Sequence, residues 1–176
     1  ICPFCAYYQQ KLLQETPFYL FLEANFTRNL QPNTLHMNLH LQHSIQNIDW
    51  NQVVETLKLV GMGYHQSHIH EKAFSNSQAV VFVFDGSLMV GFGRAISDGA
   101  YQAAIYDVAV LPSYQGKGIG KLILESIVQQ CPGCSFILYA SPGKERFYEK
   151  AQFRKMKTGM ALFTNIEGMK DKGFTE

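Results

Sequence analysis

Charged residues are scarce in this sequence. Only 16% of its 176 residues are Asp, Glu, Lys or Arg, against about 25% in an ordinary soluble protein. The sequence has fifteen Lys and Arg and fourteen Asp and Glu. The formal net charge of +1 is too small to attract nucleic acid or an anionic membrane electrostatically. No stretch approaches the roughly 18 consecutive apolar residues of a membrane span. We therefore expect no nucleic-acid partner and no membrane partner.

The shortage of charge is confined to the first part of the chain. Residues 1–43 contain only four charged side chains, namely Lys11, Glu15, Glu23 and Arg28. The length suits one domain of roughly 100–200 residues with an appendage, and a hydrophobic content of 47% suffices for a buried core. We therefore divide the chain into an N-terminal extension of uncertain origin, residues 1–42, and one globular domain, residues 43–176.

Four cysteines form two C-x-x-C pairs, Cys2/Cys5 and Cys131/Cys134. A pair of downstream histidines could complete a zinc site with the first pair, but the gap is far longer than the roughly 12–15 residues of a zinc finger, so we expect no metal. The second pair resembles a redox motif, yet it follows a predicted helix instead of opening one. Because Pro-Gly is a turn dipeptide, we favour reduced thiols at a turn, which indicates a cytoplasmic protein.

Hydrophobic patterning divides the domain into strands and helices. Strands are expected at 43–48, 80–84, 88–96, 103–110 and 135–140, with a final strand or pair in 153–163, and helices at 50–60, 68–74, 118–130 and 144–152. Asp49 is the expected N-cap of the first helix, and Asp85-Gly86 is the expected turn of a hairpin. A β-hairpin followed by β-α-β-α-β predicts an α/β domain with a mixed sheet.

Residues 107–121 carry the strongest functional signal. Their sequence, DVAVLPSYQGKGIGK, runs from a strand through a turn into a glycine-rich loop that opens a helix. Gly116, Gly118 and Gly120 let backbone N–H groups approach a ligand closely. The helix N-terminus adds unpaired donors and the positive end of a dipole, and Lys121 adds charge. This combination predicts a phosphate or pyrophosphate site.

The spacing of these glycines differs from that of the two common nucleotide motifs. A dinucleotide fingerprint requires G-x-G-x-x-G, and a nucleotide-triphosphate loop requires G-x-x-x-x-G-K-[ST]. Here the pattern is G-x-G-x-G, Lys121 comes one residue early, and Leu122 replaces the hydroxyl that would hold magnesium. A glycine-rich turn without a ligand is the remaining alternative, but three alternate glycines are unfavourable without a reason.

The loop Gln115-Gly-Lys-Gly-Ile-Gly120 resembles the Q/R-x-x-G-x-G/A pyrophosphate loop of the GCN5-related N-acetyltransferase (GNAT) superfamily, which binds acetyl-coenzyme A. Ile137-Leu-Tyr-Ala140 is similar to the next core strand of that family. Phe147-Tyr-Glu-Lys-Ala-Gln-Phe153 is similar to its F-Y-x-x-x-G-F segment. The resemblance covers residues 43–165 and is greatest to the serotonin-type and related small-amine acetyltransferases of plants and cyanobacteria.

The resemblance implies a three-layer α/β fold, with a mixed, mostly antiparallel sheet flanked by helices. In such a fold the strand at 107–110 bulges and splays from 137–140, and the resulting slot takes the pantetheine arm of acetyl-CoA. The residues implied to bind this co-substrate are Val108, Ala109, Val110, Gln115, Gly116, Lys117, Gly118, Ile119, Gly120, Lys121, Ser141 and Tyr148.

Two residues are candidates for proton transfer. Tyr148 occupies the position of the family's general-acid tyrosine. Its phenol, with an ordinary pKa of about 10, is protonated at neutral pH. The alternative is a buried tyrosine packed by Phe147. Many relatives carry Glu where this chain has Ala104, so Asp107 is our candidate for the base or the anchor of the substrate ammonium. A strand-end Asp bonded to neighbouring backbone is the alternative.

Other positions depart from the pattern of the family. His65, His68 and His70 lie where relatives place substrate-contacting helices, although we expect solvated surface histidines. Gln152 replaces a glycine, so a turn of positive φ there would use a less permissive residue. Aromatic residues could line an amine pocket or simply pack in the core: Tyr64, Phe74, Phe92, Tyr101, Tyr106 and Phe163.

The resemblance implies an acetyl-CoA-dependent N-acetyltransferase acting on the primary amine of a small molecule, by direct attack in a ternary complex. One alternative is acetylation of protein N-termini or lysines, although no acidic cluster is present to steer a basic peptide. Another is a non-catalytic acyl-CoA-binding regulatory module. No motif identifies the amine. A homodimer is common among relatives, and the resemblance therefore implies that this chain could form one.

Overall fold

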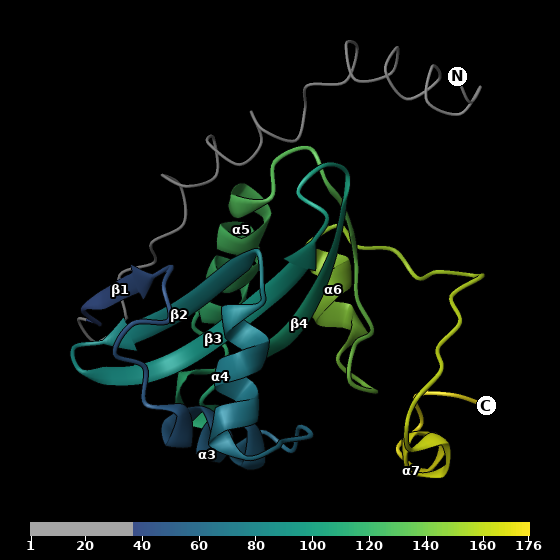
Figure 1. Ribbon diagram of the computed structural model, residues 1–176, viewed down its shortest axis with the longest axis horizontal. Helices are drawn as coiled ribbons and strands as arrows, with labels where there is room; N and C mark the ends of the chain where they lie inside the picture. Colours follow the sequence, from purple (N-terminus) through teal and green to yellow (C-terminus); the bar gives the residue numbers. More distant parts are fainter. Residues whose placement is uncertain (1–36) are drawn as a thin grey trace. The chain divides into compact units, whose positions relative to one another are not determined.

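The computed structural model describes residues 37–176 (Figure 1). The regular elements discussed below all lie in one compact unit, residues 38–176. The N-terminal cysteine pair and nearly all of the predicted extension lie outside the described residues. None of the helices within residues 37–176 is long and apolar enough to cross a membrane.

A five-stranded sheet forms the centre of the second unit. Its strands are β1 (Leu39–Gln42), β2 (Ala79–Asp85), β3 (Leu88–Ser97), β4 (Gln102–Val110) and β5 (Ser135–Ile137), in the order β1-β2-β3-β4-β5. The first three pairings are antiparallel and only β4–β5 is parallel. The predicted mixed, mostly antiparallel sheet is therefore confirmed.

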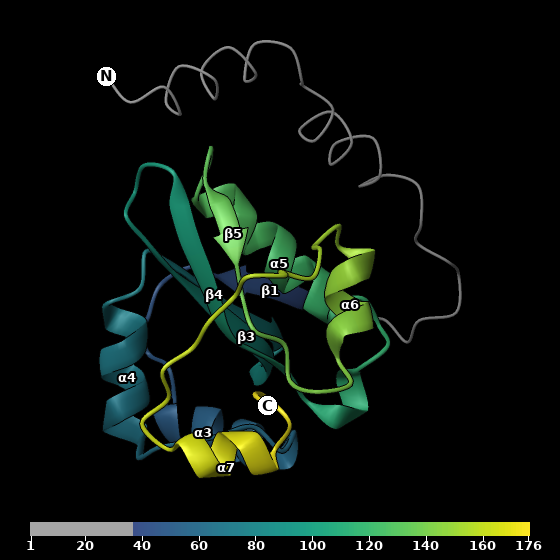
Figure 2. The same cartoon turned by 90° about the vertical axis from the view of Figure 1, so that its right-hand side faces the viewer.

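Helices cover both faces of this sheet (Figures 1 and 2). On one face lie α3 (Trp50–Leu59) and α4 (Ser67–Ser75), and on the other lie α5 (Ile119–Gln130) and α6 (Glu145–Lys150). A short helix, α7 (Ile166–Asp171), follows near the C-terminus. Asp49 caps α3 as predicted, because its side chain accepts the N–H groups of Asn51 and Gln52.

The two faces of β2 explain its unbroken apolar run. Val81 and Val83 join the apolar cluster under α5, whereas Val80 and Phe82 join the cluster under α3 and α4. Successive side chains of a strand point to opposite faces, so a strand covered on both sides needs apolar residues at every position. This arrangement confirms the predicted three-layer α/β architecture.

The strand β4 changes its pairing half-way along its length. Its register with β3 shifts between Arg94↔Tyr106 and Phe92↔Ala109, so β4 carries one extra residue there. At this bulge Asp107 has a φ of 54°. On the other side, β4 pairs with β5 only from Gln102 to Ala104. Beyond Ala104 the two strands diverge, which is the splayed arrangement that the family resemblance implies.

Two of the predicted strands are wrong. Residues 43–48 form a loop, because Asn47 adopts a φ of 58° and the side chain of Gln42 donates to the carbonyl oxygens of Ser44 and Gln46, closing a turn. The edge strand is β1 instead, which lies within the range assigned to the extension. Residues 153–163 form no strand, since β5 offers only a three-residue ladder on which to add one.

The strand predicted at 135–140 is also shorter than expected. Only Ser135–Ile137 is extended and paired, and Ile137 and Tyr139 are about half exposed. The apolar sequence therefore does not mark a fully buried strand here. Its residues beyond Ile137 leave the sheet at the point where β4 and β5 separate.

Two glycines of β3 let α5 approach the sheet closely. A Cβ atom at Gly93 would lie 2.7 Å from Ile123 Cγ2 and 3.2 Å from Ile127 Cδ1. A Cβ atom at Gly91 would lie 2.9 Å from the carbonyl oxygen of Ala109. Ile123 and Ile127 are fully buried, so neither can move aside without disturbing the core.

We expect Gly93→Ala to destabilise the domain by about 1–3 kcal/mol, because the added methyl group would overpack this contact. The matched control is Gly63→Ala, at an exposed loop position where a Cβ atom meets nothing within 4 Å. Urea denaturation monitored by circular dichroism would measure both. Equal stability of the two variants would contradict the close packing of α5 on β3.

Candidate active site

The glycine-rich loop presents a row of backbone donors. A short 3-10 turn, η1 (Pro112–Tyr114), leads into the exposed residues Gln115–Gly118, and Gly118 forms the N-cap of α5 with a φ of 86°. The first helical bond runs from Leu122 N–H to the Gly118 carbonyl, at 3.0 Å. The N–H groups of residues 119–121 precede that bond and lack a carbonyl within the helix.

The space around this loop suits an anion. At Gly118 and at Gly116, whose φ is 76°, an added Cβ atom would meet nothing within 4 Å. Only glycine adopts such φ values without strain, so the loop keeps its backbone bare where a ligand would approach. Lys117 is exposed, and Lys121 is exposed with its Nζ 3.6 Å from Glu125. These groups match the chemistry of a pyrophosphate site.

Two hydrogen bonds fix the loop to the sheet. The Tyr114 hydroxyl donates to Asp85 at 2.9 Å, and the Gln115 amide donates to the Val110 carbonyl at 3.0 Å. The ammonium of Lys117 lies 4.8 Å from the centroid of the Tyr114 ring. The bond to Asp85 raises the pKa of Tyr114. Sequence analysis missed this role of Tyr114 and Asp85, because it joins the loop to a hairpin that is remote in sequence.

The residues assigned to the pantetheine slot lie on the unpaired part of β4. Val108 and Val110 are half-buried and Ala109 is buried, all beyond Ala104, where pairing with β5 ends. The β4 edge that faces away from β3 is therefore available there to pair with an extended ligand. Ser141 lies half-buried in the turn before α6, where its carbonyl accepts the N–H of Lys144.

The helix α6 brings Tyr148 to the same region. A Cβ atom at Gly120 would lie 3.0 Å from Phe147 Cζ, so α6 packs directly against the first turn of α5. Tyr148 contacts Phe147 and Phe153, with ring centroids 4.9 and 6.0 Å away. Burial raises the pKa of its phenol, which keeps the hydroxyl protonated at neutral pH. Gln152, at the end of the segment 147–153, has a φ of 69°, so a residue other than glycine makes the turn of positive φ there.

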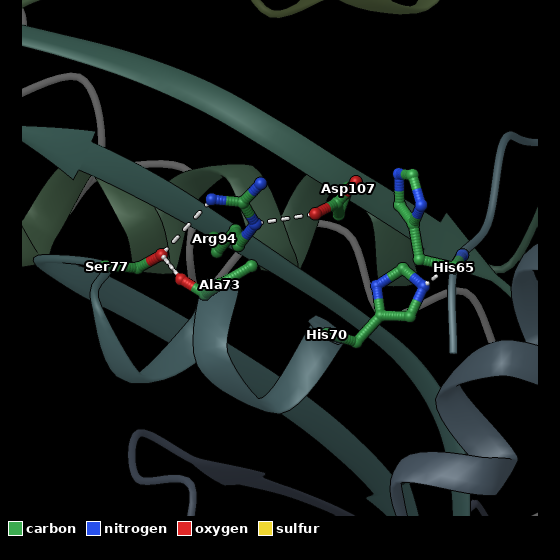
Figure 3. A network of polar contacts seen from close by, with 6 residues as sticks. All are labelled: His65, His70, Ala73, Ser77, Arg94 and Asp107. Atoms are coloured by element: carbon green, nitrogen blue, oxygen red, sulfur yellow. Dashed lines mark hydrogen bonds and ion pairs between the residues drawn. The ribbon is translucent and has the colours of Figure 1, made fainter. Parts of the chain in front are cut away.

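Asp107 is held by an arginine that sequence analysis did not single out. Arg94 Nε donates to Asp107 Oδ2 at 2.6 Å, and the two side chains are only 13% and 22% exposed. The Arg94 Nη1 donates to Ser77 Oγ at 3.3 Å, and Ser77 in turn donates to the Ala73 carbonyl (Figure 3). The Asp107 contact is therefore to a cation and not to neighbouring backbone. The sequence signal for this role is a charged residue, Arg94, within the otherwise apolar sequence of β3.

The rings of Phe74 and Tyr106 flank the guanidinium of Arg94, with centroids 5.7 and 5.1 Å from its Cζ. Tyr106 also contacts Tyr139, which in turn meets Phe163 and Phe174 from the C-terminal segment. Tyr106 and Phe163 are thus brought together near Asp107. Phe74 reaches the same group through Arg94, whereas Phe92 is buried in the core and Tyr64 and Tyr101 are exposed.

The expectation for His70 is wrong. His70 is only 4% exposed, whereas His65 and His68 are exposed as expected. Its Nε2 accepts the backbone N–H of His65 at 3.0 Å, which fixes the proton of the neutral ring on Nδ1. Burial lowers the pKa of His70, and Figure 3 shows the rings of His65 and His70 together on the side of Asp107 opposite Arg94.

Comparison with known proteins decides the family. Residues 76–155 match the family described as "Acetyltransferase (GNAT) domain". The chain is 30% identical over 132 residues to "Uncharacterized N-acetyltransferase ycf52" of Porphyra purpurea, an alignment that covers 73% of this chain and 71% of that protein. The chain belongs to the GNAT family. The family and the enzyme class predicted from the sequence, N-acetyltransferase, are thus confirmed.

Other GNAT proteins resemble the chain over similar lengths. "Serotonin N-acetyltransferase 2, chloroplastic" of Oryza sativa subsp. japonica is 30% identical over 120 residues, which are 64% of this chain and 60% of that protein. The solved structure of a probable acetyltransferase from meticillin-resistant Staphylococcus aureus is 26% identical with a TM-score of 0.63, covering 71% of this chain and 98% of that one. The chain spans 55% of the ycf52 protein of Pyropia yezoensis, 71% of that of Porphyra purpurea and 63% of that of Gracilaria tenuistipitata var. liui.

We expect His70 to make the stability of this GNAT domain depend on pH. Because the folded-state pKa lies below the ordinary value of 6.5, the unfolded state binds more protons when the pH falls below that value. Stability is therefore full above 6.5 and declines as the pH falls towards the lower, folded-state pKa. Urea denaturation at several pH values between about 7.5 and about 5.5 would measure the slope.

The variant His70→Gln keeps a hydrogen-bond acceptor and does not titrate, so its stability should fall less steeply over the same pH range. His68→Gln, an exposed position on the same helix, should retain the wild-type slope. A slope for His70→Gln equal to that of the wild type would show that His70 is not the titrating group.

Proposed function

We propose that the chain transfers the acetyl group of acetyl-CoA to the primary amine of a small molecule, in a ternary complex of enzyme, acetyl-CoA and amine. The observation that carries this proposal is the placement of Asp107. Its carboxylate lies at the bulge of β4, beyond the point where β4 and β5 diverge, and is paired with Arg94, whose guanidinium lies against the rings of Phe74 and Tyr106. A carboxylate next to aromatic faces suits an organic ammonium ion.

The donor side would be bound by backbone groups. The N–H groups of the loop Gln115–Gly118 and of the first turn of α5 would hold the pyrophosphate, with Lys117 and Lys121 adding charge. The open edge of β4 at Val108–Val110 would pair with the pantetheine arm as an added strand does. One N–H there would polarise the acetyl carbonyl.

The acceptor side would use the ion pair of β3 and β4. Arg94 binds Oδ2 of Asp107, and Oδ1 would receive the substrate ammonium. The amine must lose a proton before its nitrogen attacks the acetyl carbonyl. Asp107 is the candidate acceptor for that proton, either directly or through water. Forming the new N–C bond breaks the C–S bond, and the departing thiolate takes its proton from Tyr148.

The serotonin N-acetyltransferase of rice supports a small-amine acceptor, because its name gives serotonin, a small amine, as its acceptor. The same name places the rice protein in the chloroplast. The cytoplasmic location of the present chain remains a prediction from its cysteines, and the homodimer remains a prediction from the family resemblance. The identity of the amine is the question that a direct assay answers.

The first experiment measures thiol release from acetyl-CoA in the presence of aliphatic and aromatic primary amines and of peptides with a free N-terminus or lysine. We expect turnover with small amines. In Tyr148→Phe we expect kcat to fall about 10²-fold, since the general acid is removed. The matched control is Tyr101→Phe, which removes a hydroxyl from an exposed turn.

Other outcomes of this assay have distinct meanings. Turnover only with peptides would identify a protein acetyltransferase. Binding of acetyl-CoA without turnover of any amine, and without an effect of Tyr148→Phe, would identify a regulatory module. If acetyl-CoA does not bind, both the enzymatic and the regulatory function are wrong.

We further expect Asp107→Asn to lower kcat/KM for the amine by about 10- to 100-fold, the loss of one charged hydrogen bond worth roughly 1.5–3 kcal/mol. The affinity for acetyl-CoA, measured by calorimetry, should stay unchanged, because Asp107 faces the acceptor. Glu71→Gln, which removes an exposed carboxylate on α4, is the control. An equal loss of acetyl-CoA affinity in Asp107→Asn would indicate that the residue only maintains the bulge.

A further inference from the structure

Two cysteines between α5 and β5 have no part in the proposed reaction. Cys131 and Cys134 enclose Pro132-Gly133, and both thiols are free. Gly133 has a φ of 79°, and the Cys134 N–H donates to the Cys131 carbonyl at 3.4 Å. Pro followed by glycine of positive φ is typical of a type II β-turn, whose end Cα atoms lie less than about 7 Å apart. A disulfide joins Cα atoms about 4.4–6.8 Å apart, so the turn brings the cysteines within range.

The Cys134 thiol lies beside the last residue of β3, with its Sγ 3.6 Å from Ser97 Oγ. Both cysteine side chains pack in the apolar cluster under α5, where Cys131 is 4% exposed and Cys134 is partly exposed. The two thiols therefore share one apolar environment at the two ends of the turn, where a bridge between them would lie.

The turn is anchored on both sides. Before it, the Gln130 amide donates to the Val80 carbonyl at 3.3 Å. After it, the Ser135 N–H donates to the Tyr101 carbonyl at 2.8 Å. From Ser135 onward β5 makes three residue pairs with β4, and then the strands diverge. The cysteine turn thus lies at the closed end of the divergence between β4 and β5, which we call the hinge.

We propose that Cys131 and Cys134 form a dithiol site that exchanges with small-molecule disulfides of the glutathione type and closes to a disulfide at the hinge. Neither the GNAT reaction nor the proposed substrate requires this site. Closing it makes a covalent ring of the turn that positions β5. The ring restricts the backbone where β4 and β5 are joined.

The exchange has two steps that balance. The thiolate of Cys134, the more exposed cysteine, attacks one sulfur of glutathione disulfide, and the first glutathione leaves as a thiolate that takes up a proton. The thiolate of Cys131 then attacks Cys134 Sγ and releases the second glutathione. Two protein thiols are oxidised while one glutathione disulfide is reduced to two glutathione molecules. Burial raises the pKa of the Cys131 thiol, so a smaller fraction of it is thiolate at neutral pH than of an exposed cysteine.

The test uses the full chain with Cys2→Ser and Cys5→Ser, so that only the hinge cysteines remain. The protein is reduced, freed of reductant, treated with glutathione disulfide and analysed by intact mass. We expect the loss of two hydrogen atoms per chain, reversed by dithiothreitol. In the same background Cys131→Ser should gain one glutathione, because no second thiol releases it. Cys134→Ser should stay unmodified, because the remaining thiol is buried.

Three mass results would overturn the proposal: no change in the parent protein, addition of two glutathione molecules to it, or equal modification of the two single variants. Hydrogen exchange supplies the second measurement. The amides of Ser135–Ile137 should exchange more slowly in the oxidised parent than in the reduced one, with no difference in treated Cys134→Ser. Unchanged exchange would overturn the placement of the disulfide at the hinge. Neither measurement depends on acetyl transfer, so its outcome is separate from that of the proposed function.

Discussion

One extra residue in β4 determines the shape of the site. The strand pairs with β3 on both sides of the bulge, and with β5 only as far as Ala104, three residues before Asp107. The bulge places Asp107 against Arg94, and the edge of Val108–Val110 that follows has no strand partner on the β5 side. A left-handed φ at a residue other than glycine costs of order 1–3 kcal/mol and persists only where surrounding contacts enforce it. The proposed donor slot and the proposed acceptor carboxylate therefore lie on one short segment of β4.

The side chain at the bulge is held in an ion pair between Arg94 and Asp107. It is neither fully buried nor exposed, so its Coulomb attraction and its desolvation oppose each other and the net gain in stability is small. The ion pair instead fixes the position of the carboxylate, because the guanidinium lies against the rings of Phe74 and Tyr106 and donates a hydrogen bond to Ser77. The carboxylate is thereby linked to α4 through Ser77, although Asp107 is 32 residues beyond the end of that helix in sequence.

The local parts of this architecture could be predicted from the sequence, and the long-range parts could not. The loop Gln115–Gly120 and the cap at Asp49 depend on residues a few positions apart, and the structure has both where the sequence puts them. The role of Arg94 and the burial of His70 arise from contacts between elements distant in the chain. For His70 the helical pattern was correct, but which face of α4 meets the sheet depends on the packing of Phe74.

The failed strand predictions follow from the same distinction. An alternating or apolar pattern fits a strand, but a strand also needs a partner with free backbone groups. β1 forms at Leu39–Gln42 because β2 offers it an edge, despite the polar residues within it. Residues 153–163 have the residues of a strand and no such edge, because β5 has only three paired residues.

The two halves of the site are thus supported differently. The donor loop is tied by Tyr114 to Asp85 at the tip of the β2–β3 hairpin, and its ligand groups are backbone atoms, which are common to every sequence that can adopt the turn. The proposed acceptor half is made of side chains from α4, β3, β4 and the C-terminal segment. In the proposed reaction, substitutions there would change the amine without disturbing the loop. The loop pattern therefore indicates the family, and the side chains of the other half, not the loop, would select the amine.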